Sequence, residues 1–395
     1  MGFDVQKIRQ DFAVLKKDIV YFDSSCVSLK PIQVINAMNE YYAEFPGCGN
    51  RSNHKFGREV TERVELARRK VGKFLSTKRS EEIIFTKNST EGLNLVANSF
   101  KFSKGDKILI SDKEHNSNLI PWQILAKNKG LILDTYKFGD LESFKQHAKN
   151  AKLISFVHTS NLDGSTQDAK ELIKISHDFG AKVLVDGAQS APHKEINLRK
   201  LDADFFVASG HKMLGPSGTG ILYGKKEELE KLSLFVAGGE TVKDSTYKNF
   251  VVEDIPYRFE AGLQNYAGII GLGAATDYLQ KVGLSNIEKH EINLNKKLTE
   301  SLLKIKGVNI LGPTSSEKRG GITSFNINGI DPHDIALQLD SSANIMIRSG
   351  YHCCHSWFNA NKVPGSARAS LYLYNTEEEV RLFIKSLETA LKILK

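Results

Sequence analysis

The sequence predicts an α/β protein with a large, mainly parallel sheet and a second, smaller α+β domain. Short apolar runs alternate with amphipathic stretches of helical period through the middle of the chain. Several runs are apolar almost throughout, as expected for a parallel sheet covered by helices on both faces. After about residue 280 the pattern changes, and a length of 395 residues exceeds the needs of one small domain.

Six runs are expected to form the strands of the large sheet, with helices between them. They comprise residues 81–86, 106–111, 152–158, 182–186, 204–209 and 220–224. Helical patterns begin at Ser89 and near residue 168. This alternation predicts parallel strands joined by right-handed crossovers.

The last third of the chain predicts the smaller domain. Its expected elements are a charged amphipathic helix over 284–305, a strand within 320–329, a helix near 331–340 and a last helix from about Glu377. We therefore expect a large domain over residues 21–280. Residues 1–20 are expected to pack with residues 281–395 in the small domain, since domain boundaries need not follow chain order.

Composition narrows the class of protein. The formal net charge of +8 comes from Lys and Arg interleaved with Asp and Glu, without the basic, aromatic-rich block of a nucleic-acid groove, so no nucleic-acid partner is expected. The longest apolar stretch, AGIIGLGAA, is too short to span a membrane. The charged start MGFDVQKIRQDF lacks a signal peptide's apolar core, and four cysteines make no disulfide framework. A reducing cytoplasm is therefore expected.

Polar side chains follow five of the expected strands at the point where each strand ends. Ligands of open α/β sheets bind beyond these carboxyl ends. The side chains are Ser89, Thr90, His115, Asn161, Asp186, Gln189, Ser209, His211 and Lys212. Each has an ordinary explanation when taken alone, such as a helix cap or a surface charge. Polar groups at five strand ends along one edge nevertheless predict a ligand site.

The set suits a cofactor with an aromatic ring and a basic ring nitrogen, as in pyridoxal phosphate (PLP). A lysine with a depressed pKa attacks such a cofactor as the free amine, and Lys212 is the candidate. A carboxylate keeps the ring nitrogen protonated, so that the ring acts as an electron sink, and Asp186 is placed to do so. We expect His115 to stack on the ring.

The remaining polar groups suit the other parts of that cofactor. Gln189 or Asn161 is expected to donate a hydrogen bond to the ring oxygen. The phosphate is expected at a helix start with free N–H groups and nearby hydroxyls. Its predicted contacts are Ser89, Thr90, Ser209 and His211.

Longer segments around these residues resemble the class V aminotransferase group of fold-type I PLP enzymes. The similar segments are FTKNSTEGLNLVA, EHNSNLIPW, DGAQSAPH, SGHKMLGPSGTGILYG and RFEAG. The resemblance runs from YFDSS near residue 21 to RASLYLYNTEEEV near residue 380, and is strongest to the cysteine desulfurase/selenocysteine lyase branch. It implies that Lys212 binds PLP as a Schiff base, that Asp186 pairs with the ring nitrogen and that His115 stacks on the ring.

The carboxyl-terminal motifs resemble the parts of the family that bind and react with the substrate. Arg368 in ARASLYLYN resembles the arginine that binds the substrate carboxylate, and a guanidinium fork suits that group. MIRSGYHCCHSW resembles the family's active-site cysteine loop, with Cys353 as the nucleophile and Arg348 and His352 beside it. Asn161 and Arg348 are expected to help Arg368 hold the substrate. The resemblance implies removal of sulfur from L-cysteine, or selenium from selenocysteine, with release of alanine.

The resemblance also implies partners. The sulfur held on Cys353 would pass to an acceptor protein, with iron–sulfur cluster assembly as the usual role in this family. A homodimer is expected, because the active site of this fold lies at the subunit interface.

Three departures from the family pattern bear on these expectations. AGLQN replaces the usual AGTPN, so that Leu263 stands where a threonine reaches the partner subunit's phosphate, and Gln264 or Asn265 could compensate. Cys354 follows Cys353 directly, which leaves the identity of the working thiol open. The following HSWF is bulkier than the usual continuation and could reshape the entrance for the sulfur acceptor.

Other interpretations remain open from the sequence. A zinc site at His352–His355 is disfavoured, because four consecutive side chains cannot surround one ion, and we expect no metal. Another class V reaction, such as transamination, epimerisation or a β-lyase reaction releasing sulfide, would need no thiol at Cys353. A non-catalytic scaffold that only binds a sulfur-transfer partner would need neither Lys212 nor Asp186.

Overall fold

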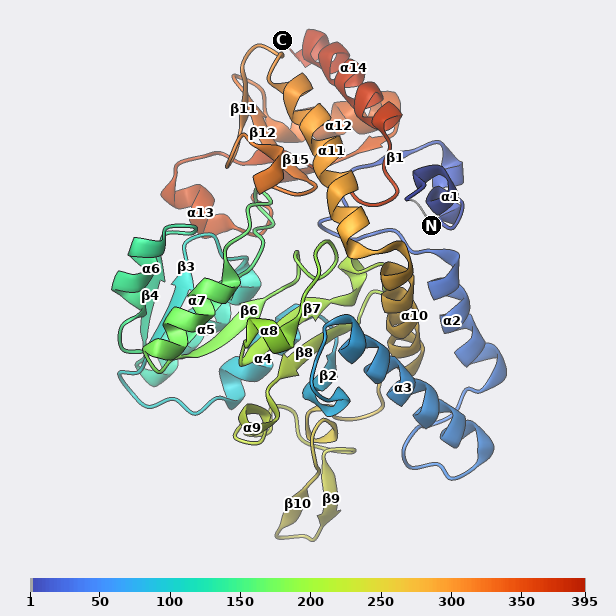
Figure 1. Ribbon diagram of the computed structural model, residues 1–395, viewed down its shortest axis with the longest axis vertical. Coiled ribbons are helices and arrows are strands. Elements are labelled where there is room, and N and C mark those ends of the chain that lie inside the picture. Colours follow the sequence, from blue (N-terminus) through green and yellow to red (C-terminus); the bar gives the residue numbers. More distant parts are fainter. Residues whose placement is uncertain (1–2, 395) are drawn as a thin grey trace.

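The structure is a computed structural model that describes residues 3–394. Its largest element is a seven-stranded sheet in the order β2-β8-β7-β6-β5-β3-β4 (Figure 1). Its strands are β2 (Ile83–Thr86), β3 (Lys107–Ser111), β4 (Ile132–Tyr136), β5 (Ala151–Val157), β6 (Lys182–Asp186), β7 (Phe205–Ser209) and β8 (Gly220–Gly224). The predicted α/β class with a large, mainly parallel sheet is confirmed.

The direction of the strands brings five carboxyl ends to one edge. β8 runs antiparallel to both β2 and β7, whereas the other neighbouring strands are parallel. Because β2 and β7 both oppose β8, they point the same way as β3, β5 and β6. We call the edge where these five strands end the carboxyl edge.

The sheet contains one strand, β4, that was not among the six expected from the sequence. It pairs with β3 at the end of the sheet, where two of its five residues, including Ile132, are exposed and only Tyr136 is buried. Its sequence, ILDTY, therefore lacks the continuous apolar run of a strand covered on both faces.

Helices cover both faces of the sheet, as the apolar strands require. Val183 and Val185 of β6 pack in one core cluster with α3 (Lys55–Phe74), α6 (Leu141–Ala148), α7 (Ala169–Asp178) and α10 (Tyr266–Val282). Leu184, between them, faces the opposite way into a second cluster with α4 (Ser89–Ser99) and α5 (Ile120–Lys129). Successive side chains of a strand point to opposite faces, so burial of both faces explains the apolar strands.

A four-stranded antiparallel sheet forms the second layer system, at the top of Figure 1. Its strands, in spatial order, are β11 (Val308–Ile310), β12 (Ile322–Ile327), β15 (Ser366–Ser370) and β14 (Arg348–Gly350). Three helices pack with it around a separate core: α11 (Leu284–Leu302), α12 (Pro332–Ala343) and α14 (Glu377–Leu394). The strand and the helices expected after residue 280 are thus present.

The amino-terminal segment lies against this second sheet system. β1 (Val20–Tyr21) pairs in parallel with β13 (Ile345–Met346). From α1 (Val5–Arg9), Arg9 forms an ion pair of 2.7 Å with Glu379 of α14. The chain then passes through residues 22–30 to α2 (Ile32–Glu44), which packs on α10.

The remaining elements are short. They are α8 (Leu198–Leu201), α9 (Lys226–Leu229), α13 (His355–Ala360) and the hairpin of β9 (Val242–Ser245) with β10 (Phe250–Val252). The hairpin projects from the body of the molecule (Figure 1). No helix within residues 3–394 is both long and apolar enough to cross a membrane.

Candidate active site

The carboxyl edge of the large sheet borders a cavity of about 180 Å³. All nine strand-end residues singled out in the sequence line it: Ser89, Thr90, His115, Asn161, Asp186, Gln189, Ser209, His211 and Lys212. The second sheet system contributes Arg348, His352 and Arg368 from the opposite side, and residues 25–26 close the cavity between them. The site therefore lies where the two sheet systems meet.

Lys212 and Asp186 form the floor of the cavity from adjacent strands. Lys212 is in the 3₁₀ turn Gly210–Lys212 after β7, and Asp186 is the last residue of β6. Burial lowers the pKa of Lys212, and Arg368 adds to this, although Asp186 opposes it. Burial raises the pKa of Asp186, whose Oδ1 accepts a hydrogen bond of 2.9 Å from the Ala188 amide. The lysine is thus favoured as an amine, and the buried carboxyl would be stabilised by a cationic ligand atom.

The start of α4 has the hydroxyl groups and helix start expected of the predicted phosphate cradle. Asn88 caps the helix by accepting from the Glu91 amide, and the Ser89 amide and hydroxyl bond to the Ser209 hydroxyl at 2.9 and 2.8 Å. A Cβ on Gly220 of β8 would lie 2.5 Å from the Asn88 Cα, so only glycine allows the helix start to approach the sheet this closely. A helix start with hydroxyl groups beside it binds phosphate through its N–H groups and dipole.

The two predicted histidines are neutral. Burial, helped by Lys212, lowers the pKa of His115 to about 3, and its Nδ1 accepts a hydrogen bond of 3.0 Å from the Ser117 amide. Burial and Lys212 also lower the pKa of His211 to about 4. Thr90 is exposed at the cavity mouth, with its hydroxyl 2.8 Å from the Ser117 hydroxyl.

The two amides expected at the ring oxygen are engaged within the chain. Gln189 Nε2 donates to the Ser25 carbonyl at 2.8 Å, and its buried Oε1 has no partner among the described residues. Asn161 Nδ2 donates to the His352 carbonyl at 2.7 Å. Both residues border the cavity as expected, but their amide groups also tie together segments that the sequence does not show to be neighbours.

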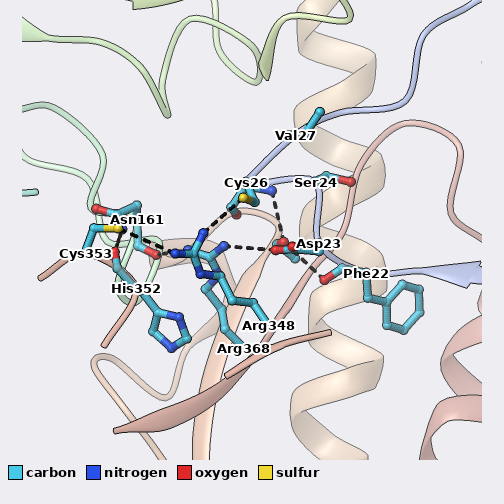
Figure 2. Close-up of polar contacts among 12 residues, drawn as sticks. Phe22, Asp23, Ser24, Cys26, Val27, Asn161, Arg348, His352, Cys353 and Arg368 are labelled. Atoms are coloured by element: carbon cyan, nitrogen blue, oxygen red, sulfur yellow. Dashed lines mark hydrogen bonds and ion pairs between the residues drawn. The ribbon is translucent and has the colours of Figure 1, made fainter. Parts of the chain in front are cut away.

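Two arginines lie opposite each other on neighbouring strands of the second sheet. Arg348 of β14 pairs directly with Arg368 of β15. Arg368 Nη1 donates to the Asn161 carbonyl at 3.0 Å, and Nη2 contacts Asp23 Oδ1 at 3.1 Å (Figure 2). Its buried Nε has no partner among the described residues, and burial lowers its pKa. This guanidinium therefore retains a free donor that suits a carboxylate ligand.

The cysteine loop is held in an unusual conformation beside these arginines. His352 and Cys353 have φ angles of 47° and 60°, in the left-handed region that costs non-glycine residues about 1–3 kcal/mol each. The Cys353 carbonyl accepts from the Asn116 amide at 2.7 Å, and Arg348 Nη2 donates to Cys353 Sγ at 3.5 Å. Contacts from the large sheet thus hold Cys353 with its sulfur at a guanidinium.

Cys354 has a different environment from its neighbour. It is buried with Leu162 and Phe358, and its Sγ donates to Asn161 Oδ1 at 3.3 Å. Burial raises its pKa to about 12, so it stays a thiol at neutral pH. The bulky residues after it form α13, in which Phe358 is buried in this same cluster.

Sequence reasoning missed two residues of this site, Asp23 and Cys26. Both lie in the segment 22–30 after β1. Cys26 Sγ lies 3.0 Å from Arg348 Nη1, and Asp23 pairs with Arg368. The only signal was their place in the family-like segment YFDSSC, which has no periodic pattern to indicate which way each side chain points.

Leu263, which stands where the family has a threonine, lies at the surface. Its side chain is 73 % exposed, just before α10. Gln264 Nε2 donates to the Ala261 carbonyl, and Asn265 caps α10 while its Nδ2 donates to the Gly218 carbonyl. The amide nitrogens of both candidate substitutes for the family's threonine are therefore engaged within their own chain.

The residues present fit PLP, because a buried amine, a buried carboxyl that favours a cation and a phosphate cradle border one cavity. This combination at the carboxyl edge of an α/β sheet defines the class of the protein, the fold-type I PLP enzymes. The family model "Aminotransferase class-V" matches residues 20–383. The chain belongs to the class V aminotransferase family, which confirms the family predicted from its motifs, and PLP is its cofactor.

Relatives within the family are similar over nearly the whole chain. A probable cysteine desulfurase of Halalkalibacterium halodurans is 41 % identical, covering 98 % of this chain and 97 % of the relative. One from Pyrococcus abyssi is 40 % identical, covering 99 % and 98 %. The solved cysteine desulfurase of Thermococcus onnurineus NA1 has a TM-score of 0.95 at 39 % identity, covering 98 % of each chain. The cysteine desulfurase CsdA of Escherichia coli has a TM-score of 0.93 at 30 % identity, covering 100 % of each.

Proposed function

We propose that the protein is a PLP-dependent cysteine desulfurase, which converts L-cysteine to L-alanine and retains the sulfur on Cys353 as a persulfide. The observation that carries this proposal is the position of Cys353 and two arginines beside the cavity that holds Lys212 and Asp186. Full-length similarity to cysteine desulfurases supports the same reaction.

The residues at the carboxyl edge would hold the cofactor. Lys212 Nζ would bind it covalently, Asp186 would hold the proton of its ring nitrogen, and neutral His115 would pack on the ring. The start of α4, with Ser89, Thr90, Ser209 and His211, would hold its phosphate, and Gln189 and Asn161 would border its ring. When bound, PLP withdraws electrons from the substrate's α-carbon.

Arg368 binds the substrate carboxylate. Its unpartnered Nε and the Nη2 that now contacts Asp23 provide the two parallel donors that a carboxylate accepts. Arg348 and Asn161 stand next to it, so that the substrate side chain is directed towards Cys353. Lys212, whose lowered pKa favours the free amine, removes and returns the proton at the α-carbon.

Cys353 takes the sulfur through its thiolate, the reactive form of a cysteine, while Arg348 donates a hydrogen bond to its Sγ. Its Sγ bonds to the substrate sulfur while the substrate's carbon–sulfur bond breaks, and the electron pair of that bond remains with the substrate. Protonation of the carbon gives alanine, so that L-cysteine and the Cys353 thiol become L-alanine and a Cys353 persulfide. Burial of Cys354, which raises its pKa to about 12, and its contact with Asn161 support Cys353 rather than Cys354 in this role.

The finer assignments belong to the same proposal. The persulfide passes to a sulfur-acceptor protein, for iron–sulfur cluster assembly or another sulfur transfer, in a reducing cytoplasm. The active protein is a homodimer. Residues 21–280 form a large domain, and residues 1–20 with 281–395 form a small domain that carries Arg368 and the Cys353 loop.

The reaction is tested by measuring alanine and sulfide from L-cysteine, with and without a thiol reductant, for the wild type and Cys353→Ala. We expect alanine and sulfide in equal amounts only with reductant, and no turnover by the variant. A Cys353→Ala variant that still makes alanine at the wild-type rate would instead identify a β-lyase or another class V reaction. A yellow protein that makes no alanine would keep the cofactor and refute the choice of reaction.

Lys212→Ala tests the attachment of the cofactor. We expect loss of the yellow colour and of all alanine formation, because no other amine borders the cavity floor among the described residues. The visible spectrum and an alanine assay check this, with the exposed Lys170→Ala as the matched control. Normal colour and turnover in Lys212→Ala would contradict the assignment.

A further inference from the structure

Two thiols in this site share one guanidinium. Arg348 Nη1 donates to Cys26 Sγ at 3.0 Å, and Nη2 of the same side chain donates to Cys353 Sγ at 3.5 Å. In Figure 2 the two sulfurs lie on either side of the guanidinium, one from the segment after β1 and one from the cysteine loop. The proposed reaction uses only Cys353, which leaves Cys26 without a role.

We propose that Cys26 is a second catalytic thiol, which accepts the transferred sulfur from Cys353 and so frees Cys353 for another turnover. This inference rests on the proposed desulfurase function and adds a step after it. The sulfur leaves the substrate on Cys353 and is then held on Cys26.

The step balances without any outside reagent. The Cys26 thiolate attacks the terminal sulfur of the Cys353 persulfide, and a new bond forms between that sulfur and Cys26 Sγ. The bond from the terminal sulfur to Cys353 Sγ breaks, and its electron pair leaves as the Cys353 thiolate. One disulfide-type bond replaces another, so that nothing is oxidised or reduced overall.

Arg348 suits both ends of this exchange. Thiol exchange needs a thiolate as the attacking group and favours a leaving thiol that is stabilised as an anion. Because one guanidinium donates to both sulfurs, a negative charge that moves from Cys26 to Cys353 stays in hydrogen-bond contact with the same cation throughout the exchange. Burial lowers the pKa of Arg348, but the two sulfurs and Asp23 raise it by more, so its charge persists through the transfer.

The segment that carries Cys26 is held in place and reaches the surface. The Cys26 amide donates to the Asp23 carbonyl at 3.0 Å, and the Ser25 amide donates to the Ser370 hydroxyl at 3.0 Å. Cys26 itself is half-buried at the cavity wall, and the next residue, Val27, is exposed. Cys26 is therefore held against the same guanidinium as Cys353, in a segment that reaches the surface at the next residue, where an acceptor would bind.

The relay is tested by locating persulfides after reaction with excess L-cysteine without reductant. Thiols and persulfides are alkylated, and peptides are analysed by mass spectrometry, for the wild type, Cys26→Ala, Cys353→Ala and the control Cys48→Ala. Cys48 is half-buried like Cys26 but does not line the cavity. We expect roughly two sulfane sulfurs per wild-type chain, on Cys353 and Cys26, with an initial burst of two alanines.

The variants then distinguish the role of Cys26 from that of Cys353. Cys26→Ala should keep the first turnover but show a burst of about one alanine and a persulfide on Cys353 alone. Cys48→Ala should match the wild type, and Cys353→Ala should place no sulfur on Cys26. Wild-type protein that makes alanine but has a persulfide only on Cys353 would overturn the relay.

A second measurement needs neither substrate nor PLP. Mild oxidation with diamide, followed by peptide mapping without reduction, should give a disulfide between Cys26 and Cys353 in wild type and in Cys48→Ala. Absence of this disulfide would overturn the relay, whatever the activity. Failure to form any alanine would refute the proposed function instead, and the disulfide would still decide whether the two thiols meet.

Discussion

At the scale of single residues, burial rather than residue type determines which side chains of this site can react. Cys353 and Cys354 are neighbours in sequence, yet one sulfur contacts a guanidinium and the other is enclosed by Leu162 and Phe358. The burial of Cys354 raises its pKa to about 12 and removes it as a nucleophile at neutral pH. Adjacent identical residues carry no sequence signal for this difference, which depends on contacts with Asn161 far along the chain.

Arg368→Ala should raise KM for L-cysteine far more than it weakens binding of PLP. Two charge-assisted hydrogen bonds to the carboxylate are lost, and at roughly 1.5–3 kcal/mol each this corresponds to roughly a hundredfold to ten-thousandfold change. Steady-state kinetics and PLP titration check this, with the exposed Arg381→Ala as control. Unchanged KM in Arg368→Ala would show that the carboxylate binds elsewhere.

The buried histidines make stability depend on pH. Burial lowers the pKa of His158 from 6.5 to about 4, so the unfolded chain binds more protons between these values and the free energy of unfolding rises with pH there. Urea midpoints should therefore fall as pH decreases from about 6.5 to 4. His158→Gln should show a shallower fall, since one titrating group is removed while His115 and His211 remain. Equal slopes for both proteins would contradict this assignment.

At the scale of elements, the contact between β8 and the start of α4 fixes the position of the phosphate cradle. Gly220→Ala would place a Cβ 2.5 Å from the Asn88 Cα and push the helix start away from the sheet. We expect weaker PLP binding and a lower melting temperature, since such overpacking costs about 1–3 kcal/mol.

Fluorescence titration with PLP and thermal unfolding measure both effects of Gly220→Ala. Gly239→Ala is the control, because a Cβ there would have open space. Equal PLP affinity in the two variants would show that the helix start is free to move without loss of binding.

The elements also show what the sequence could and could not predict. Strands buried on both faces, such as β6, were predictable because their apolar runs are continuous, and the polar residues at their ends border one cavity as expected. The edge strand β4 was not, because two of its five residues are exposed. Cys26 and Asp23 were missed for a related reason: a loop has no periodicity, so its side-chain directions follow only from contacts with β14 and β15.

At the scale of the whole molecule, the proposed homodimer needs a surface on which two chains can associate. Leu263, Tyr247 and Phe250 are large apolar side chains exposed near the start of α10 and on the projecting hairpin. Exposed apolar side chains of this kind mark association surfaces when they gather in a patch. Leu263 is the first candidate to test, because the family resemblance places its position beside the partner subunit in the proposed homodimer.

Light scattering should give a mass of about twice 44.0 kDa for the active protein. Leu263→Asp should weaken the dimer, whereas Leu382→Asp, which changes an exposed leucine of α14, should not. A single-chain mass at concentrations where the enzyme is active would contradict the homodimer.

The pairing of Arg348 with Arg368 across β14 and β15 has a consequence beyond catalysis. Like charges directly opposite each other destabilise a sheet, so the folded chain without ligand carries a cost at this position. A carboxylate that binds between them relieves part of this repulsion, and the unfolded chain offers it no equivalent site. If the amino-acid substrate binds there as proposed, it would raise the free energy of unfolding as well as react, and the supply of substrate would then extend the lifetime of the protein.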